Sequence, residues 1–297
     1  YAYDVLFAQS DDRGNSWSAP ASPHDDGTPT EHGFVSTWPS AGTVGLIWLD
    51  GRRTLGEDDD RPGENGMTLR SAAIDPDGAI AAEQLVDDLV CDCCQTDVAV
   101  ASKGPIGVYR NRTVDEVRDI YITRHRDGAW QPGEAFSEDG WTIAACPVNG
   151  PSIAAHGDHV AVAWFTGAVD SPRAYVRLSN NGGRSFGDKM LVAAGGVLGQ
   201  MRIAWIGDNA FAVSWLAKSG KLNDVRVRSV TTAGEFGDPL HRVLAMHPRR
   251  TGAGAAAKWG SRSGRARRCS RRCRTSASSS STRSTTPLSS SPRRRTT

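Results

Sequence analysis

Two eight-residue segments share a pattern that constrains the fold more than any other feature of the chain. One reads SDDRGNSW from Ser10 to Trp17, and the other reads SNNGGRSF from Ser179 to Phe186. The oxygens of Asp12 and Asn181 suit hydrogen bonds from the backbone N–H groups of their own turns. The glycines at positions 14 and 183 tolerate the positive φ of a tight turn. Each segment therefore predicts a β-hairpin whose closing aromatic ring packs under the turn. The eight residues assigned to these turns are Ser10, Asp12, Gly14, Trp17, Ser179, Asn181, Gly183 and Phe186.

Weaker copies of this turn recur along the chain. The five turn glycines, Gly14, Gly78, Gly128, Gly183 and Gly234, are separated by 64, 50, 55 and 51 residues. Upstream of the last four turns lie short apolar runs at 44–49, 106–109, 160–165 and 211–216, each followed by an alternating segment. Short apolar runs of this kind suit strands that are buried on both faces. A period near 50 with four short strands per repeat predicts an all-β propeller.

The repeated turn resembles the Asp-box, or BNR, repeat of the sialidase-like β-propellers. The resemblance covers residues 1–248 and implies a six-bladed propeller, of which about four to five blades are present. The first turn lacks the two inner strands of its blade, and the chain opens on Tyr1 without an initiator Met or a signal peptide. We therefore expect an incomplete propeller from a longer gene product.

Residues 249–297 differ in composition from the rest. They hold 13 arginines, one lysine and no acidic residue, so residues 1–248 carry 21 basic against 33 acidic residues. An Arg- and Ser-rich segment with little apolar surface is expected to be disordered. It is either a basic tail suited to nucleic acid or anionic lipid, or sequence read out of frame, which we favour. We expect no nucleic-acid partner, no transmembrane segment and a monomer.

Charged residues gather in the loops that a propeller places opposite its Gly turns. Sialidases bind the sugar carboxylate with three arginines, use an acidic residue as general acid and use a Tyr–Glu pair as nucleophile. By position, the resemblance makes Arg52, Arg110 and Arg112 the arginine candidates and Asp50 or Glu31 the acid. Further substrate-binding candidates on this face are His32, Arg118, Asp119, Asn149 and Arg173.

The resemblance implies an exo-sialidase-like glycoside hydrolase acting on acidic sugars. The family's N-terminal Arg-Ile-Pro segment and its late nucleophilic Tyr are not found in this sequence, so we expect this chain to be inactive. The alternative is a non-catalytic propeller that binds a glycan or a protein. We assign no cofactor and no metal.

Several candidates have simpler explanations. The alternative for Asp50 is a cap of the turn that contains Arg52, and the alternative for Arg118 is an ion pair with Asp119 within a blade. His32 suits a structural role, proton transfer or metal ligation. The acidic segment Glu57–Arg61 suits a solvated loop.

Four cysteines lie in neighbouring loops of the same face. Cys91, Cys93 and Cys94 share one loop, and Cys146 lies in the loop one blade further on. A disulfide from Cys146 to one of the three fits this arrangement and would place the protein in the periplasm or outside the cell. Soft-metal ligation and free thiols are the alternatives.

Overall fold

The computed structural model describes residues 2–40, 42–54, 66–81 and 83–246. Tyr1–Arg249 forms one compact unit, close to the predicted propeller boundary at residue 248. Two segments discussed above, Glu57–Arg61 and the tail 249–297, lie outside the described residues.

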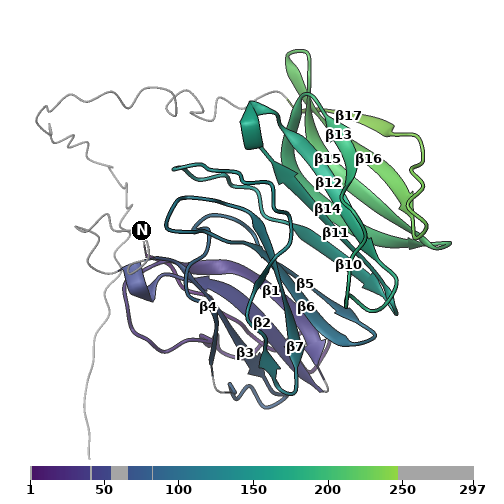
Figure 1. Cartoon of the computed structure of the whole chain (residues 1–297). Coiled ribbons are helices and arrows are strands. Elements are labelled where there is room, and N and C mark those ends of the chain that lie inside the picture. The colour runs from purple at the N-terminus through teal and green to yellow at the C-terminus, as the bar shows by residue number, and fades with distance from the viewer. Residues whose placement is uncertain (1, 41, 55–65, 82, 247–297) are drawn as a thin grey trace, which may run out of the picture. The chain divides into compact units, whose positions relative to one another are not determined.

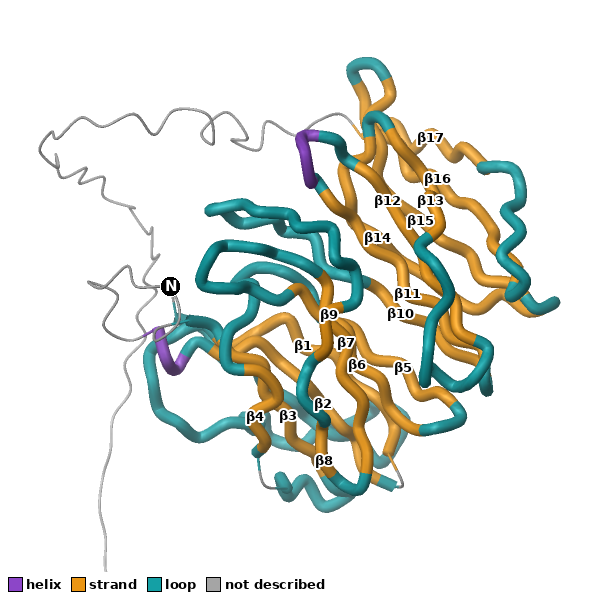
Figure 2. Tube along the Cα trace, viewed as in Figure 1, coloured by secondary structure: helices purple, strands orange, loops and turns teal. Residues whose placement is uncertain are grey.

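The described chain is almost entirely β-structure, arranged as four successive antiparallel sheets (Figures 1 and 2). The first two sheets are β1 (His32–Ser40), β2 (Thr43–Asp50), β3 (Thr68–Ile74) and β4 (Gln84–Asp87), and then β5 (Asp97–Ala101), β6 (Gly104–Arg110), β7 (Ile120–Arg126) and β8 (Ala129–Trp130), with β9 (Glu134–Ala135) also paired to β7. The last two are β10 (Ser152–His156), β11 (His159–Thr166), β12 (Arg173–Ser179) and β13 (Met190–Ala194), and then β14 (Val197–Gly207), β15 (Ala210–Ser219), β16 (Leu222–Thr231) and β17 (Leu240–Met246). Helix is limited to two 3-10 turns, η1 (Arg52–Thr54) and η2 (Ala168–Asp170), among the described residues. The predicted all-β propeller sheets are confirmed.

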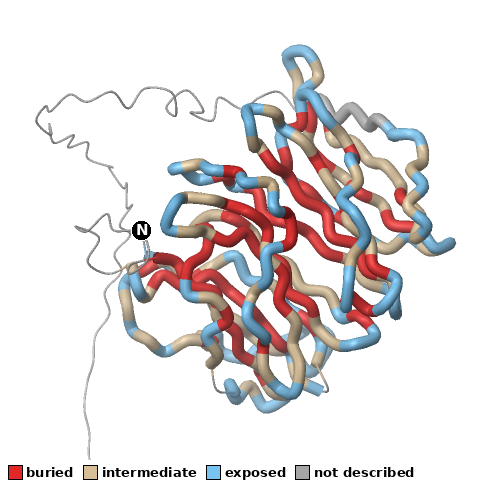
Figure 3. The backbone as a smooth tube through the Cα atoms, viewed as in Figure 1, coloured by how far each residue is buried: buried red, intermediate tan, exposed pale blue. Residues whose placement is uncertain are grey.

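The second strand of each sheet carries the core. It is flanked by strands on both sides. In β2, β6 and β11 both faces are buried, which explains their continuous apolar sequences, whereas burial alternates along β15. Trp48, Tyr109 and Trp164 are fully buried at equivalent positions of β2, β6 and β11, and Trp215 of β15 is almost so. Figure 3 shows buried positions running along the strands while the connecting loops are mostly exposed.

The innermost strands β1, β5, β10 and β14 pack on one another in that order and form the hub of the propeller. Polar groups join them: the Thr96 hydroxyl donates to Phe34 O at 2.8 Å, and the Ser152 hydroxyl donates to the Asp97 carboxylate at 2.8 Å. The Ile203 N–H then donates to Ser152 Oγ at 3.2 Å. Each sheet is thus bonded to the next at the hub, as blades are in a propeller.

Two of the hub strands contain β-bulges near their first residues. The pairing of β1 with β2 shifts between Gly33 and Ser36, and Phe34 there has φ 52°. The pairing of β14 with β15 shifts between Gly199 and Arg202, and Gln200 has φ 54°. Bulges redirect side chains and are frequent beside functional sites.

The two copies of the turn make matching hydrogen bonds. Asp12 accepts from the N–H of Ser16 at 2.8 Å and from the Ser10 hydroxyl at 2.9 Å. Asn181 accepts from the N–H of Ser185 at 3.1 Å and from the Ser179 hydroxyl at 2.9 Å.

The closing aromatics of the two turns differ in burial. Phe186 packs edge-on against Phe136 of the preceding sheet, with ring centroids 5.0 Å apart. Trp17 lies near Gly14 but is 65% exposed, so its ring is not buried under the turn as predicted. Phe186 has the ring of Phe136 as a partner, whereas no aromatic ring among the described residues stacks on Trp17.

Candidate functional site

Charged side chains gather at one end of the first sheet, where β1 begins and β2 ends. His32 is paired with Asp50 across the two strands. Both residues therefore lie at the end of the sheet opposite to its Gly turn, which is the turn equivalent to that of Asn181 in the third sheet. Asp50 is fully buried. We call the group His24, Asp26, His32, Asp50 and Arg52 the histidine–carboxylate cluster.

Asp50 is held in its ionised form. Its carboxylate accepts hydrogen bonds from Trp48 Nε1 at 2.9 Å, from the Arg52 backbone at 3.1 Å and from Arg52 Nε at 2.7 Å. Burial alone would raise the pKa of Asp50, but these bonds outweigh it and lower that pKa. Both the turn cap and the Arg52 pair considered from sequence are therefore present.

Asp26 and two stacked histidines complete the cluster. The rings of His24 and His32 lie 3.9 Å apart between centroids at an angle of 12°. Asp26 Oδ2 lies 3.1 Å from both His24 Nδ1 and His32 Nε2, and 3.3 Å from Arg52 Nη2. Burial would raise the pKa of Asp26, but hydrogen bonds from Thr28 and the nearby charges hold it well below its usual value.

Tyr3 and Glu31 border the cluster. The two residues form a parallel bridge, and the Tyr3 ring lies over Gly33. Burial and the facing Glu31 carboxylate raise the pKa of the Tyr3 phenol. A tyrosine and a carboxylate thus lie side by side at the start of β1.

Arg110 lies apart from this cluster. It is the last residue of β6 in the second sheet, and its side chain is buried. Its guanidinium donates to the main-chain oxygens of Asn149 at 2.7 Å and Phe165 at 2.7 Å, and also to that of Arg118. It stacks over Trp141 at 4.9 Å. The guanidinium thus joins two loops to strand β11.

Arg112 and Arg118 bind Glu116 of their own loop, and Arg112 also binds Asp92 of the loop before β5. Glu116 accepts from Arg112 Nη2 at 2.6 Å and from Arg118 Nη2 at 2.6 Å, and Asp92 lies 3.2 Å from Arg112 Nη1. Burial would raise the pKa of Glu116, but its two arginine partners lower it. Asp119 instead accepts from the backbone of Gly140, so it does not pair with Arg118.

The remaining predicted residues are dispersed. Asn149 bridges loops, accepting from the Gln200 N–H at 2.8 Å and donating to Pro147 O at 3.1 Å. Arg173 begins β12 and donates to the Tyr175 hydroxyl at 3.4 Å.

The four loop cysteines form two disulfides. Cys93 is bonded to Cys146, with Cα atoms 6.0 Å apart, and Cys91 is bonded to Cys94, with Cα atoms 5.7 Å apart. The first bond ties the loop before β5 to the loop before β10.

A pocket of about 460 Å³ opens between the hub strands, and we call it the axial pocket. Asp97, which begins β5, lines it together with the exposed Arg202 and Phe34. Burial raises the pKa of Asp97 despite hydrogen bonds from Ile153 and Ser152 and the charge of Arg202. The pocket lining includes Phe34, Ser36, Gln95, Asp97, Ser152 and Arg202.

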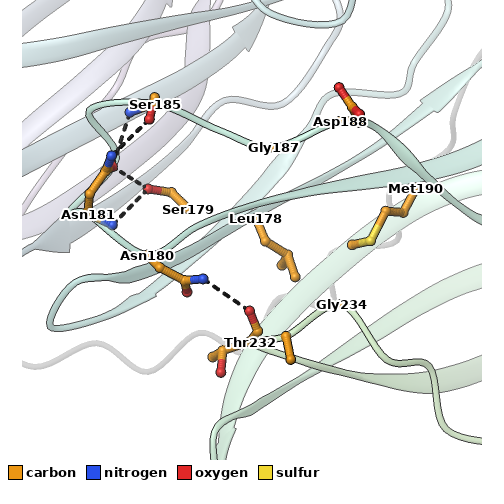
Figure 4. A pocket seen from close by; sticks show the side chains of 11 residues that line it. Leu178, Ser179, Asn180, Asn181, Ser185, Gly187, Asp188, Met190, Thr232 and Gly234 are labelled. Atoms are coloured by element: carbon orange, nitrogen blue, oxygen red, sulfur yellow. Dashed lines mark hydrogen bonds between the residues drawn. The ribbon is translucent and has the colours of Figure 1, made fainter.

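A second hollow lies at the Gly-turn end of the last two sheets (Figure 4). Its polar groups bind one another: Asn180 donates to Thr232 O at 3.2 Å, and Asn181 binds Ser185. We therefore assign this hollow to turn structure.

Five residues that sequence reasoning did not select contribute to these sites: Tyr3, His24, Asp26, Asp97 and Arg202. His24 and Asp26 stand in a polar run, HDDG, which was a usable signal. The position of Asp97 at the start of a hub strand was another. No pattern in the sequence predicts that Tyr3 lies beside Glu31.

Comparison with known proteins bears on the fold. No family model matches the chain, and no curated protein matches it by sequence. A variant of the NanB sialidase from Streptococcus pneumoniae superposes with a TM-score of 0.52 at 9% identity, over 82% of this chain and 56% of that one. The family 117 glycoside hydrolase Zg3597 from Zobellia galactanivorans gives 0.45 at 11% identity, over 72% and 70%. The α-L-arabinofuranosidase PaAbf62A from Podospora anserina gives 0.43 at 11% identity, over 72% and 69%.

The chain therefore has a β-propeller fold similar to that of the NanB sialidase. The superposition on the sialidase shows the fold alone, because fold and chemistry are separable. No helix in the described part of the chain is long and apolar enough to cross a membrane.

Proposed function

We propose that the chain is a propeller of the glycoside hydrolase type that binds an acidic sugar in the axial pocket. The observation that carries this proposal is the meeting of three groups there. Arg202 offers a cation, Asp97 a carboxyl group and Phe34 an apolar ring. Sugar sites combine an apolar surface with a few polar groups that fix orientation.

Arg202 is the proposed partner of the sugar carboxylate. It is exposed, and its one hydrogen bond among the described residues runs from Nη1 to Met201 O at 2.9 Å. Arg52, Arg110 and Arg112 are bound to carboxylates or main-chain oxygens. A guanidinium that is not already paired binds a carboxylate through two parallel hydrogen bonds.

Asp97 suits the general acid, because a raised pKa keeps a carboxyl group protonated closer to neutral pH. Asp50 suits that role less well, because its pKa is lowered. Glu31 remains as the half-buried carboxylate beside Tyr3, and this pair has the groups that a sialidase-type nucleophile needs. We place the protein in the periplasm or outside the cell, and the Cys93–Cys146 disulfide supports this.

The engaged arginines favour a second candidate function, a propeller that binds the sugar without cleaving it. Three arginines that are held by the protein do not form a ready clamp for a transition state. Binding and turnover must therefore be measured separately.

The experiment titrates the full chain with N-acetylneuraminic acid, glucuronic acid and neutral N-acetylglucosamine by isothermal calorimetry. Loss of one charge-assisted pair in Arg202→Gln should weaken binding of the acidic sugars about 10- to 100-fold and leave the neutral sugar unaffected. Arg184→Gln is the matched control, because Arg184 is exposed in the opposite Gly turn. Equal affinity for acidic and neutral sugars would refute the proposal. Release of umbelliferone from a fluorogenic sialoside would assign the catalytic form, and binding without release would assign the second candidate.

A further inference from the structure

We propose that His24, His32 and Asp4 form a binding site for a divalent transition-metal ion. This site is independent of the sugar proposal. It follows from the composition of the histidine–carboxylate cluster and from the polar atoms that the cluster leaves unbonded.

Two buried imidazoles lack the partners that buried nitrogens normally have. The side chains of His24 and His32 are 5% and 1% exposed. Among the described residues, His24 Nε2 and both nitrogens of His32 have no hydrogen-bond partner. Leaving such atoms unsatisfied is costly, and it calls for a proton, a water or a metal ion at that place.

The Asp26 carboxylate determines which nitrogens are available. His24 Nδ1 is hydrogen-bonded to Asp26 Oδ2 at 3.1 Å, so the proton of a neutral His24 lies on Nδ1. The same oxygen lies 3.1 Å from His32 Nε2 without forming a hydrogen bond, and its negative charge favours a proton on that nitrogen. The lone pairs are then on His24 Nε2 and His32 Nδ1. A carboxylate that orients the far side of each imidazole is the usual second partner of a metal-bound histidine.

Asp4 completes the set of ligands. Asp4 Oδ1 lies 3.5 Å from His32 Nδ1 and 3.8 Å from His24 Nε2, and the three atoms lie within 4.8 Å of one another. Ligands bound tetrahedrally at about 2.0–2.2 Å are separated by about 3.3–3.5 Å. The two separations from Asp4 Oδ1 are close to this range. Asp4 is 59% exposed and borders a cavity of about 340 Å³ beside His24, which provides a path for the ion.

The local charge also favours a divalent cation. Asp4, Asp26, Asp50 and Glu83 supply four carboxylates, and Arg52 and Arg70 supply two guanidinium groups linked to them. Two negative charges remain when both histidines are neutral, and one divalent ion balances them. Imidazole ligands select Zn²⁺, Co²⁺ and similar ions over Mg²⁺ and Ca²⁺.

A second group, Asp26, His32 and Asp50, is a weaker candidate. Its carboxylates already bind Arg52, and a cation there would have to displace a guanidinium. The Asp4 site needs no such exchange. It does require the stacked rings to rotate, because the lone pairs lie in the ring planes and the planes are nearly parallel.

The test uses the full chain after treatment with EDTA, with free thiols blocked by N-ethylmaleimide so that Cys269 and Cys273 cannot bind the probe. Zn²⁺ is titrated by calorimetry, and Co²⁺ is followed by its visible absorption. One equivalent should bind, and the histidine ring signals should shift in NMR spectra as the stack opens. Asp4→Asn and His24→Gln should each weaken binding at least about tenfold.

Asp25→Asn is the matched control, because Asp25 is an exposed carboxylate of the same loop and is not a proposed ligand. It should leave the affinity unchanged. Asp4→Asn changes an exposed side chain, so it tests the site even where a histidine variant fails to fold. Absence of saturable binding, unchanged affinity in Asp4→Asn, or an equal loss in Asp25→Asn would overturn the proposal.

Discussion

Replacement of Arg110 by methionine tests whether this buried arginine holds the fold together. The guanidinium donates to main-chain oxygens of Asn149, Phe165 and Arg118, which belong to the loop before β10, to strand β11 and to the loop before β7. Methionine fills a similar volume without any donor, so three buried carbonyl groups lose their partner.

The expected loss follows from two opposing terms. Each hydrogen bond from a charged donor contributes about 1.5–3 kcal/mol, so three bonds contribute about 4.5–9 kcal/mol. Burial lowers the pKa of Arg110 to about 9, although the charges of Asp119 and Asp139 act in the opposite direction. The methionine variant does not bury a charge, and this offsets the loss of stability by about 5 kcal/mol. With the lost contact to Trp141, we expect a net destabilisation of about 3 kcal/mol.

The assay is urea unfolding of the full chain, followed by tryptophan fluorescence. Arg184→Met removes an exposed arginine and should change the free energy of unfolding by no more than about 0.5 kcal/mol. If Arg110→Met unfolds at the same urea concentration as the parent but loses sugar binding, Arg110 contacts the sugar and the structural role is refuted.

Three further predictions concern other parts of the chain. Joint replacement of Cys93 and Cys146 by serine opens a loop of 53 residues and should cost about 4 kcal/mol of unfolding free energy; a cost below about 1 kcal/mol would contradict the bond. Glu116→Gln should destabilise the protein at pH 7. The difference from the parent should shrink as the pH falls below 4.5, the ordinary pKa of Glu, and should disappear only below the lowered pKa of the folded state, because the ionised carboxyl is the form that the arginines stabilise; a difference that stays constant with pH would argue against the arginine pairs. Truncation after Pro248 should leave the urea midpoint unchanged, since the removed sequence has little apolar surface to bury, whereas a substantial loss would show that the tail packs.

The sheets could be predicted because each repeat carries its own local signals. The apolar run that contains Trp48 and the alternating segment after it became β2 and β3, and the equivalent run at Trp164 became β11. The bulge at Phe34 could not be predicted, because it depends on the register between two strands rather than on a residue type. The different burial of Trp17 and Phe186 likewise depends on the neighbouring sheet.

Part of the candidate site could be predicted from the sequence. His32, Asp50 and Arg52 could be grouped because β1 begins where β2 ends. The sequence does not distinguish an arginine that faces a pocket from one that faces main-chain oxygens, so position alone groups Arg110 with Arg52. The partners of a guanidinium are set by loop conformation, and loops carry few residue-type rules.

The order in which the hub strands pack has a consequence for how disturbances spread. Among the described strands, β5 is the link between β1 and β10, and β10 is the link between β5 and β14. Such a molecule behaves as a linear array, in which each unit senses only its two neighbours. Hydrogen exchange should therefore be slowest in the middle sheets and faster toward β4 and β17. The axial pocket is the exception to this order, because Phe34 of β1 and Arg202 of β14 both line it.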